Sequence, residues 1–201
     1  MADIQHSLIQ DPDIHEPKGA SSANSGEVYV ADGGGSGVWT PSQDLTLPTG
    51  WENWEDATYT SGSPLSLTAS TRTKVTIDGL AADTNTTYSP VGGDLWDNTN
   101  NKITPDNVGD MYDLRLRFKA TPAVSDGYIT LELDIGGSEG VILAQTQRFL
   151  KGTSEQSMLF VATVFTLDTF VANGGSIYAT SSVGVDIHSI GLLINRTHKA
   201  V

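Results

Sequence analysis

Apolar and polar residues alternate along several segments of this chain, most regularly in its second half. Within residues 111–120 the even-numbered side chains are apolar and those between them are mostly charged, and residues 128–135 repeat the pattern. Successive side chains of a β-strand point to opposite faces, so each segment has one apolar and one polar face. This pattern is typical of antiparallel strands that cover a core on one side. Residues 141–150, 158–171 and 183–194 are also predicted to be strands.

Shorter strand-like segments accompany these. We expect them at residues 54–59, 65–69, 74–77 and 176–180, separated by turn sequences such as Ser61-Gly-Ser-Pro64. No segment shows convincingly the 3.6-residue period of an amphipathic helix. Short strands at regular spacing are typical of β-sandwiches and barrels. Because several later strands are long, the sequence predicts an all-β fold with a jelly-roll β-sandwich as its architecture.

The N-terminal segment has a different composition from the rest. Residues 1–40 are rich in Asp, Ser, Gly and Pro and contain few apolar side chains. They bury too little area to offset backbone ordering, which costs roughly 1–2 kcal/mol per residue, so this extended N-terminal arm is either disordered or ordered by lying on another surface. Residues 28–31 and 38–40 flank a glycine-rich run and predict a small β-hairpin.

The predicted organisation follows from these two patterns. Residues 1–40 form the arm with its small hairpin, residues 41–50 form a linker bracketed by Pro41 and Pro48, and residues 51–201 form the jelly-roll body.

The charge of the chain restricts its partners. The formal net charge is −13 and no long run of Lys and Arg occurs, so nucleic acid is not an expected partner. The cysteine count of 0 excludes disulfides, thiolate metal sites and cysteine nucleophiles. No segment approaches the ~18–20 apolar residues of a membrane span, and no secretory signal is recognisable. We expect a soluble protein made in a cytoplasm, without a membrane partner.

The densest group of cations is Arg115, Arg117 and Lys119. Their spacing by two residues in a predicted strand places them on one face as a positive stripe. The stripe has two readings, a salt-bridged contact between subunits or an ordinary solvent-exposed face. His188, in another alternating segment, is expected to be an interface residue or a half-buried ring.

One string matches a catalytic motif. Residues 136–140, Gly-Gly-Ser-Glu-Gly, fit G-x-S-x-G, and Asp186 and His188 follow in the order of a hydrolase triad. A nucleophile elbow needs a strand, a strained turn and then a helix, whereas a strand-like segment follows here. Asp186 and His188 are also two residues apart on one predicted strand and face the same side. We interpret the string as a hairpin turn and predict that the protein is not an enzyme.

Metal ligands have no characteristic spacing in this chain. The 4 histidines form no i, i+4 or H-x-H pair, so no zinc site is expected. Asp94, Asp97, Asp106 and Asp110 lack the spacing of a calcium loop, and such residues commonly hydrogen-bond to their own turns. Calcium binding there is an alternative, but no metal or other cofactor is predicted. A glycan site is a further alternative, for which Trp96 beside Asp94 and Asp97 is the best candidate.

The arm and several body segments resemble a known group of proteins. His15-Glu-Pro-Lys-Gly19, Ser22, Gly26-Glu-Val-Tyr-Val-Ala31 and the glycine-rich turn to Trp39 resemble the N-terminal segment of tailed-bacteriophage capsid decoration (cement) and head-fibre proteins. Residues 103–118, 133–138 and 165–175 look like the jelly-roll body of the same group. The resemblance covers nearly the whole chain, through motifs that are structural in kind.

The resemblance implies a virion protein that is assembled in the host cytoplasm. It would sit as a homotrimer on the outer surface of the capsid and clamp adjacent copies of the major capsid protein, which stabilises the DNA-filled shell. The expected contacts with the shell are His15, Glu16, Pro17, Lys18 and Gly19, together with the hairpin anchors Tyr29 and Trp39. The expected subunit-interface residues are Arg115, Arg117 and His188. Similar arms occur on fibre and spike proteins, so a module that binds a receptor or glycan is the alternative.

Overall fold

The computed structural model describes residues 23–25, 27–31, 37–41, 49–90 and 94–200. The chain divides into two compact units, Met1–Leu47 and Pro48–Val201. The predicted shell contacts at residues 15–19 lie outside the described residues. Within the described residues, no helix is both long and apolar enough to cross a lipid bilayer.

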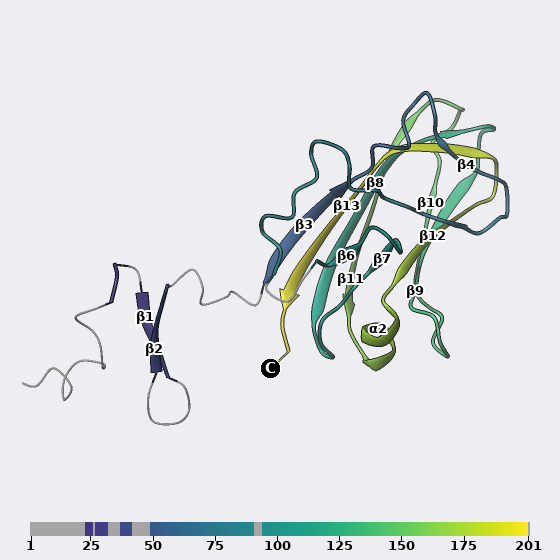
Figure 1. Ribbon diagram of the computed structural model, residues 1–201. Helices are drawn as coiled ribbons and strands as arrows, with labels where there is room; N and C mark the ends of the chain where they lie inside the picture. Colours follow the sequence, from purple (N-terminus) through teal and green to yellow (C-terminus); the bar gives the residue numbers. More distant parts are fainter. Residues whose placement is uncertain (1–22, 26, 32–36, 42–48, 91–93, 201) are drawn as a thin grey trace, which may run out of the picture. The chain divides into compact units, whose positions relative to one another are not determined.

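The N-terminal unit contains an antiparallel hairpin, coloured purple in Figure 1. Its strands are β1 (Glu27–Ala31) and β2 (Gly37–Pro41), and they pair in an unbroken register. A Cβ atom on Gly37 would lie 2.8 Å from the ring of Tyr29, so glycine allows that ring to approach the backbone of β2. The hairpin expected from the sequence is confirmed.

The larger unit is a sandwich of two antiparallel sheets (Figure 1). The five-stranded sheet has the order β11 (Gln156–Phe165), β8 (Met111–Pro122), β13 (Val185–His198) and β3 (Gly50–Glu55), with β4 (Leu65–Leu67) also paired to β13. The four-stranded sheet has the order β10 (Val141–Arg148), β9 (Tyr128–Asp134), β12 (Ser176–Ser181) and β5 (Thr73–Lys74). A further pair, β6 (Trp96–Asp97) and β7 (Lys102–Ile103), and one short helix, α2 (Asp168–Asn173), complete the described elements.

The apolar faces of both sheets form one core. In β8, Leu114, Leu116 and Phe118 are buried while Arg115 and Arg117 are exposed, as the alternation predicts. Facing side chains from β9 and β12 belong to the same buried cluster. Burial of apolar surface stabilises a fold by roughly 25 cal/mol per Å², so this shared core is the main force that holds the two sheets together.

The predicted strand at residues 158–171 is wrong in its second half. Strand β11 ends at Phe165, and the chain then forms α2, whose Phe170 is buried. The backbone N–H of Thr166 donates to the carbonyl of Asp110 at 2.9 Å, which fixes the corner between the two elements. A helix of 6 residues is too short for its period to stand out from that of a strand.

Two other predicted boundaries also shift. The strand expected at residues 54–59 is β3, which covers Gly50–Glu55. The chain turns after Glu55 because the carboxylate of Asp56 accepts hydrogen bonds from the backbone N–H groups of Tyr59 (2.6 Å) and Asp78 (3.1 Å). Strand β13 continues to His198, beyond the expected residue 194.

Candidate functional site

The hairpin presents a small aromatic surface. Tyr29 and Trp39 are cross-strand partners whose ring centroids lie 5.4 Å apart in an edge-to-face arrangement. Both side chains are only half-buried, and Val38 is exposed. The two residues that the sequence singles out as hairpin anchors thus pack on each other and keep part of their surface accessible.

The outer face of the five-stranded sheet carries the predicted positive stripe. Arg115, Arg117 and Lys119 are all exposed, which confirms that they share one face of β8. Arg117 forms an ion pair with Glu55 of β3, and Lys119 forms one with Glu155 at 2.8 Å. Most of the positive stripe is therefore paired within the chain.

The Arg117–Glu55 pair reaches across an intervening strand. Gly191 of β13 is the register partner of both Glu55 and Arg117. A Cβ atom at this position would overlap the Glu55 carboxylate, so glycine leaves the gap through which the two side chains meet. Burial raises the pKa of Glu55, while the neighbouring side chains of Asn53 and Arg117 oppose that shift.

Both ring nitrogens of His188 also have polar partners within the chain. Its Nε2 lies 2.9 Å from a carboxylate oxygen of Glu155, its Nδ1 lies 3.0 Å from the hydroxyl of Ser189, and the side chain is almost fully buried. The hydrogen bond from Lys119, followed by the contact with His188, lowers the pKa of Glu155. In the single chain His188 is therefore buried, with a polar partner at each ring nitrogen.

The edge of the sandwich near β10 and β11 exposes a group of large apolar side chains. We call this group the apolar edge; it consists of Ile142, Leu159, Val161, Phe165 and Leu167. Phe165 is 63% exposed and Leu167 is 58% exposed. A cleft of about 420 Å³ opens beside it, lined in part by Ile142, Phe165, Leu167 and Phe170. Large contiguous apolar patches on soluble proteins commonly mark contact surfaces.

The two edge strands β10 and β11 are joined by side chains. Gln145 of β10 donates a hydrogen bond to the backbone carbonyl of Val161 (2.8 Å), and Gln147 donates one to the carbonyl of Leu159 (2.7 Å). These bonds occupy carbonyl groups that an edge strand otherwise presents to another strand. The apolar edge therefore offers side chains to a partner more readily than it offers backbone groups.

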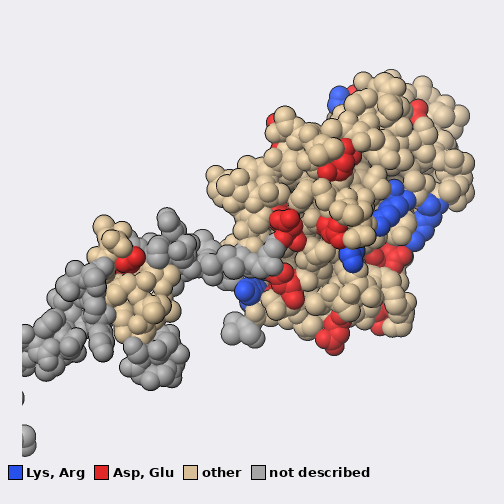
Figure 2. All heavy atoms as spheres, in the orientation of Figure 1, with Lys and Arg blue, Asp and Glu red and all other residues tan. Residues whose placement is uncertain are grey.

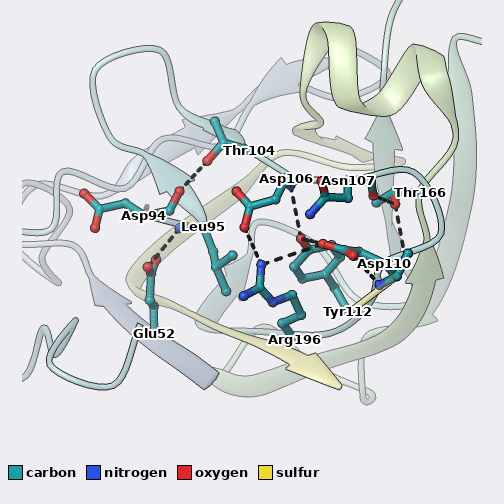
Figure 3. A network of polar contacts seen from close by, with 11 residues as sticks. Glu52, Asp94, Leu95, Thr104, Asp106, Asn107, Asp110, Tyr112, Thr166 and Arg196 are labelled. Atoms are coloured by element: carbon teal, nitrogen blue, oxygen red, sulfur yellow. Dashed lines mark hydrogen bonds and ion pairs between the residues drawn. The ribbon is translucent and has the colours of Figure 1, made fainter. Parts of the chain in front are cut away.

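A network of buried polar side chains connects β13 with the segment that precedes β8 (Figure 3). Arg196 of β13 is completely buried and forms an ion pair with Asp106, and its Nη1 lies 3.7 Å from Asp110 Oδ2. The hydroxyl of Tyr112 donates to Asp110 at 3.0 Å, and Thr166 donates to the carbonyl of Asn107. Burial, aided by the charge of Asp110, raises the pKa of Tyr112 to about 12.

A second buried carboxylate holds the β6 segment against β3 (Figure 3). The backbone N–H of Leu95 donates to Glu52 at 2.8 Å, and the indole N–H of Trp54 donates to the same carboxylate at 2.7 Å. Burial raises the pKa of Glu52, and these two hydrogen bonds oppose the shift. The Glu52 carboxylate therefore ties an irregular segment to the sheet. Its side chain is completely buried, so it offers no oxygen to a ligand at the surface.

Stability is expected to fall as the pH drops below about 4. The backbone N–H of Gly136, and next Arg72, hold the pKa of Asp134 below its ordinary 3.8. A carboxyl group with a depressed folded pKa adds stability above its unfolded pKa, and this stability is lost as the pH falls through the folded value. Burial raises the pKa of Glu52 and Glu55, so their contribution has the opposite sign and is lost as the pH rises above their ordinary 4.5.

Urea unfolding across the acid range measures this effect. Asp134→Asn should show a shallower loss of stability on the acid side than the unmodified protein, because its contribution no longer titrates. Identical acid profiles for the two proteins would contradict the assignment.

Ser138, Asp186 and His188, the residues that match a hydrolase triad in sequence order, do not contact one another as a triad. Ser138 hydrogen-bonds with its neighbour Glu139 at 3.2 Å, and Asp186 accepts a hydrogen bond from Ser66 at 2.5 Å. His188 is held by Glu155 and Ser189, as described above. The glycine-rich string forms the turn after β9, as the hairpin interpretation expects.

The prediction that Trp96 is the best candidate for a glycan site is wrong. Its side chain is 1% exposed and its indole N–H donates to the carbonyl of Ile77 at 3.3 Å, so it belongs to the core. Asp97 accepts hydrogen bonds from Thr99 and Asn100 of its own turn. Among the described residues, no group of three His, Asp or Glu side chains is placed to hold a metal ion.

The surface charge agrees with the composition. In Figure 2, Asp and Glu side chains are spread over the visible face of the larger unit, whereas Lys and Arg gather in a few small groups.

The apolar edge was not predicted from the sequence. The signal for it was present, because residues 158–165 are apolar on both faces, with Leu159, Val161 and Phe165 opposite the buried set.

Comparison with solved structures defines the class of fold. No protein-family model and no curated protein matches this chain. The structure of Eiger TNF from S. frugiperda has a TM-score of 0.50 at 8% identity, covering 77% of this chain and 96% of that chain. The PRD1 vertex protein P5 has a TM-score of 0.45 at 13% identity, covering 88% and 84%. A chain of the T13 IBDV viral particle has a TM-score of 0.36 at 7% identity, covering 83% and 35%.

The likeness to Eiger TNF, together with the sheet order, establishes the fold. The body is an all-β sandwich of antiparallel sheets with a jelly-roll-like arrangement, as the sequence predicts. At 8% identity the likeness to Eiger TNF concerns the fold alone.

Proposed function

We propose that this protein is a tailed-bacteriophage capsid decoration (cement) protein, a non-enzymatic component of the outer surface of the virion. Its N-terminal unit binds adjacent copies of the major capsid protein, and its body forms a homotrimer. An outer protein that spans neighbouring capsomers raises the free energy needed to separate them, which stabilises a shell filled with DNA.

The observation that carries the proposal is the hairpin of the N-terminal unit. A two-stranded hairpin is marginally stable by itself in water. The Tyr29–Trp39 pair and Val38 keep apolar surface accessible, so binding to a partner would bury it and stabilise the hairpin. In the proposal, residues 15–19 of the arm contact the same partner surface, as the sequence resemblance implies.

The three-fold symmetry of a trimer would increase the avidity of such a contact. Three N-terminal units on one trimer turn later binding events into intramolecular ones, which adds avidity without a new type of contact. A segment that becomes ordered on binding can cover a large surface, at a cost that several contacts offset. The net charge of −13 supports a position outside the shell, because it disfavours binding to packaged DNA.

Co-sedimentation with phage heads that lack the protein tests the capsid contact. The full chain should pellet with the heads, and a Tyr29→Ala/Trp39→Ala variant should bind them clearly more weakly. Tyr128→Ala, an exposed tyrosine on the four-stranded sheet, is the matched control and should bind normally. Failure of the full chain to pellet with heads would overturn the proposal.

The apolar edge is the proposed subunit contact, and Phe165→Asp tests it. Light scattering after size exclusion should give a mass three times that of the chain for the unmodified protein and the mass of a single chain for the variant, because a buried charge opposes apolar association. Leu80→Asp changes an even more exposed apolar side chain outside the apolar edge and should leave the trimer intact. A monomeric unmodified protein would contradict the prediction.

A further inference from the structure

A second depression lies on the outer face of the five-stranded sheet, beside the apolar edge, since Val161 is the register partner of Arg115. Its volume is about 420 Å³, and it is lined by Trp51, Asp113, Arg115, Leu193 and Asn195. All five belong to the sandwich body. The residues come from three neighbouring strands, β3, β13 and β8.

The register of the sheet brings these side chains together. Asn195 is the partner of both Trp51 and Asp113, so the three form one row across the strands. Leu193 is the partner of Arg115 in the next row that faces the same side. Neighbouring strands are about 4.8 Å apart, so an aromatic ring, a carboxylate, an amide and a guanidinium surround an area the size of one sugar ring.

The aromatic wall of the depression is held in place. Trp51 stacks on Tyr88, with ring centroids 5.0 Å apart and an interplanar angle of 28°. The backbone N–H of Trp51 also donates to the carbonyl of Tyr88 at 2.9 Å, which anchors the loop to the strand. The indole is half-buried, so its position is fixed before any ligand arrives.

The polar groups of the depression retain capacity for hydrogen bonds. One carboxylate oxygen of Asp113 accepts from the Thr163 hydroxyl at 2.6 Å, which leaves the other oxygen for a ligand. Within the part of the chain that the structure describes, the side chains of Arg115 and Asn195 have no hydrogen-bond or ion-pair partner. Arg115 differs in this from Arg117 and Lys119 on the same strand, which are paired.

We propose that this depression binds a neutral pyranose unit of a glycan. The apolar C–H face of the sugar packs on Trp51, the free oxygen of Asp113 accepts a hydrogen bond from a hydroxyl group, and Arg115 and Asn195 donate to hydroxyl oxygens. An apolar wall with a few convergent polar groups is the usual composition of a small-molecule site. A phosphate or an acidic sugar is disfavoured, because it would meet the Asp113 carboxylate and a chain of net charge −13.

This inference goes beyond the proposed decoration role and does not depend on it. The depression belongs to the body, whereas the proposed capsid contact belongs to the N-terminal unit. A decoration protein with this site would present glycan-binding pockets at the surface of the virion.

Nuclear magnetic resonance of the ¹⁵N-labelled full chain tests the proposal. The probes are the methyl glycosides of glucose, galactose, mannose and N-acetylglucosamine, with glucuronic acid as the acidic comparison. At least one neutral glycoside should shift the indole N–H resonance of Trp51, which the spectrum of Trp51→Phe assigns. No shift with any sugar, or a shift with glucuronic acid alone, would overturn the proposal.

Three variants locate the site. Arg115→Ala and Asn195→Ala should each weaken binding by about tenfold, the effect of losing one good hydrogen bond, and Trp51→Ala should abolish it. Arg148→Ala removes an exposed arginine from the four-stranded sheet and should bind normally. Normal binding by the Arg115 and Asn195 variants would place the sugar elsewhere and overturn the assignment. Co-sedimentation of Asn195→Ala with phage heads should be unchanged, which separates this test from that of the decoration role.

Discussion

Arg196→Met is expected to destabilise the body by about 3–5 kcal/mol, a large fraction of the stability of a typical domain. The side chain is 0% exposed and lies between Asp106 and Asp110 at the end of the sandwich. Removing it leaves Asp110, itself 0% exposed, as a buried carboxylate without a cationic partner. An uncompensated buried charge is among the most destabilising changes that one substitution can produce.

Urea unfolding of the full chain measures the Arg196 effect. Arg148→Ala serves as the control and should change the free energy of unfolding by less than about 0.5 kcal/mol, since Arg148 lies on the surface. Adding Asp110→Asn to Arg196→Met should recover part of the loss, because the second change removes the buried charge. A single Arg196 variant as stable as the unmodified protein would show that the network contributes nothing.

Trp96→Ala is expected to cost about 3–5 kcal/mol as well, through a different mechanism. The indole is 1% exposed, and its register partner across the β6–β7 pair is the fully buried Ile103. Truncation would leave a large cavity and free the carbonyl of Ile77, which accepts the indole N–H at 3.3 Å. The cost combines lost apolar burial with the cavity that the surrounding core cannot fill.

Thermal and urea unfolding of Trp96→Ala and Trp96→Phe separate the contributions. The phenylalanine variant should be clearly more stable than the alanine variant, since it fills much of the same space without the hydrogen bond. Trp51→Phe, at a half-buried position on the outer face, should lose much less stability than Trp96→Ala. A Trp96→Ala variant as stable as the unmodified protein would contradict the assignment of Trp96 to the core.

The contrast between the two tryptophans shows where sequence reasoning reaches its limit. Trp96 lies between acidic residues in a loop-like segment, which is the expected setting of an exposed sugar platform. The structure buries it, because Glu52 binds the backbone of Leu95 and holds the segment against the sheet. Trp51, which the sequence does not distinguish, becomes part of a depression only because Asn195 and Asp113 lie beside it across three strands.

The strands and their faces were predictable because they depend on local periodicity. The alternation of residues 111–120 determines which side chains of β8 are buried, and the polar composition around a glycine-rich run identifies the N-terminal hairpin. Backbone geometry imposes a period of two on any strand, so the pattern is legible without knowing the neighbours. The all-β class and its sandwich architecture follow from the number and spacing of such segments.

Only the tertiary structure decided which residues meet. Arg196 pairs with Asp106, 90 positions earlier in the chain, and Gly191 leaves room for a bridge between Glu55 and Arg117, 62 positions apart. No period in the sequence encodes such a pairing, because it depends on strand order and register. Local patterns therefore determined the strands and their buried faces, whereas long-range packing determined the buried charges, the apolar edge and the candidate sugar site.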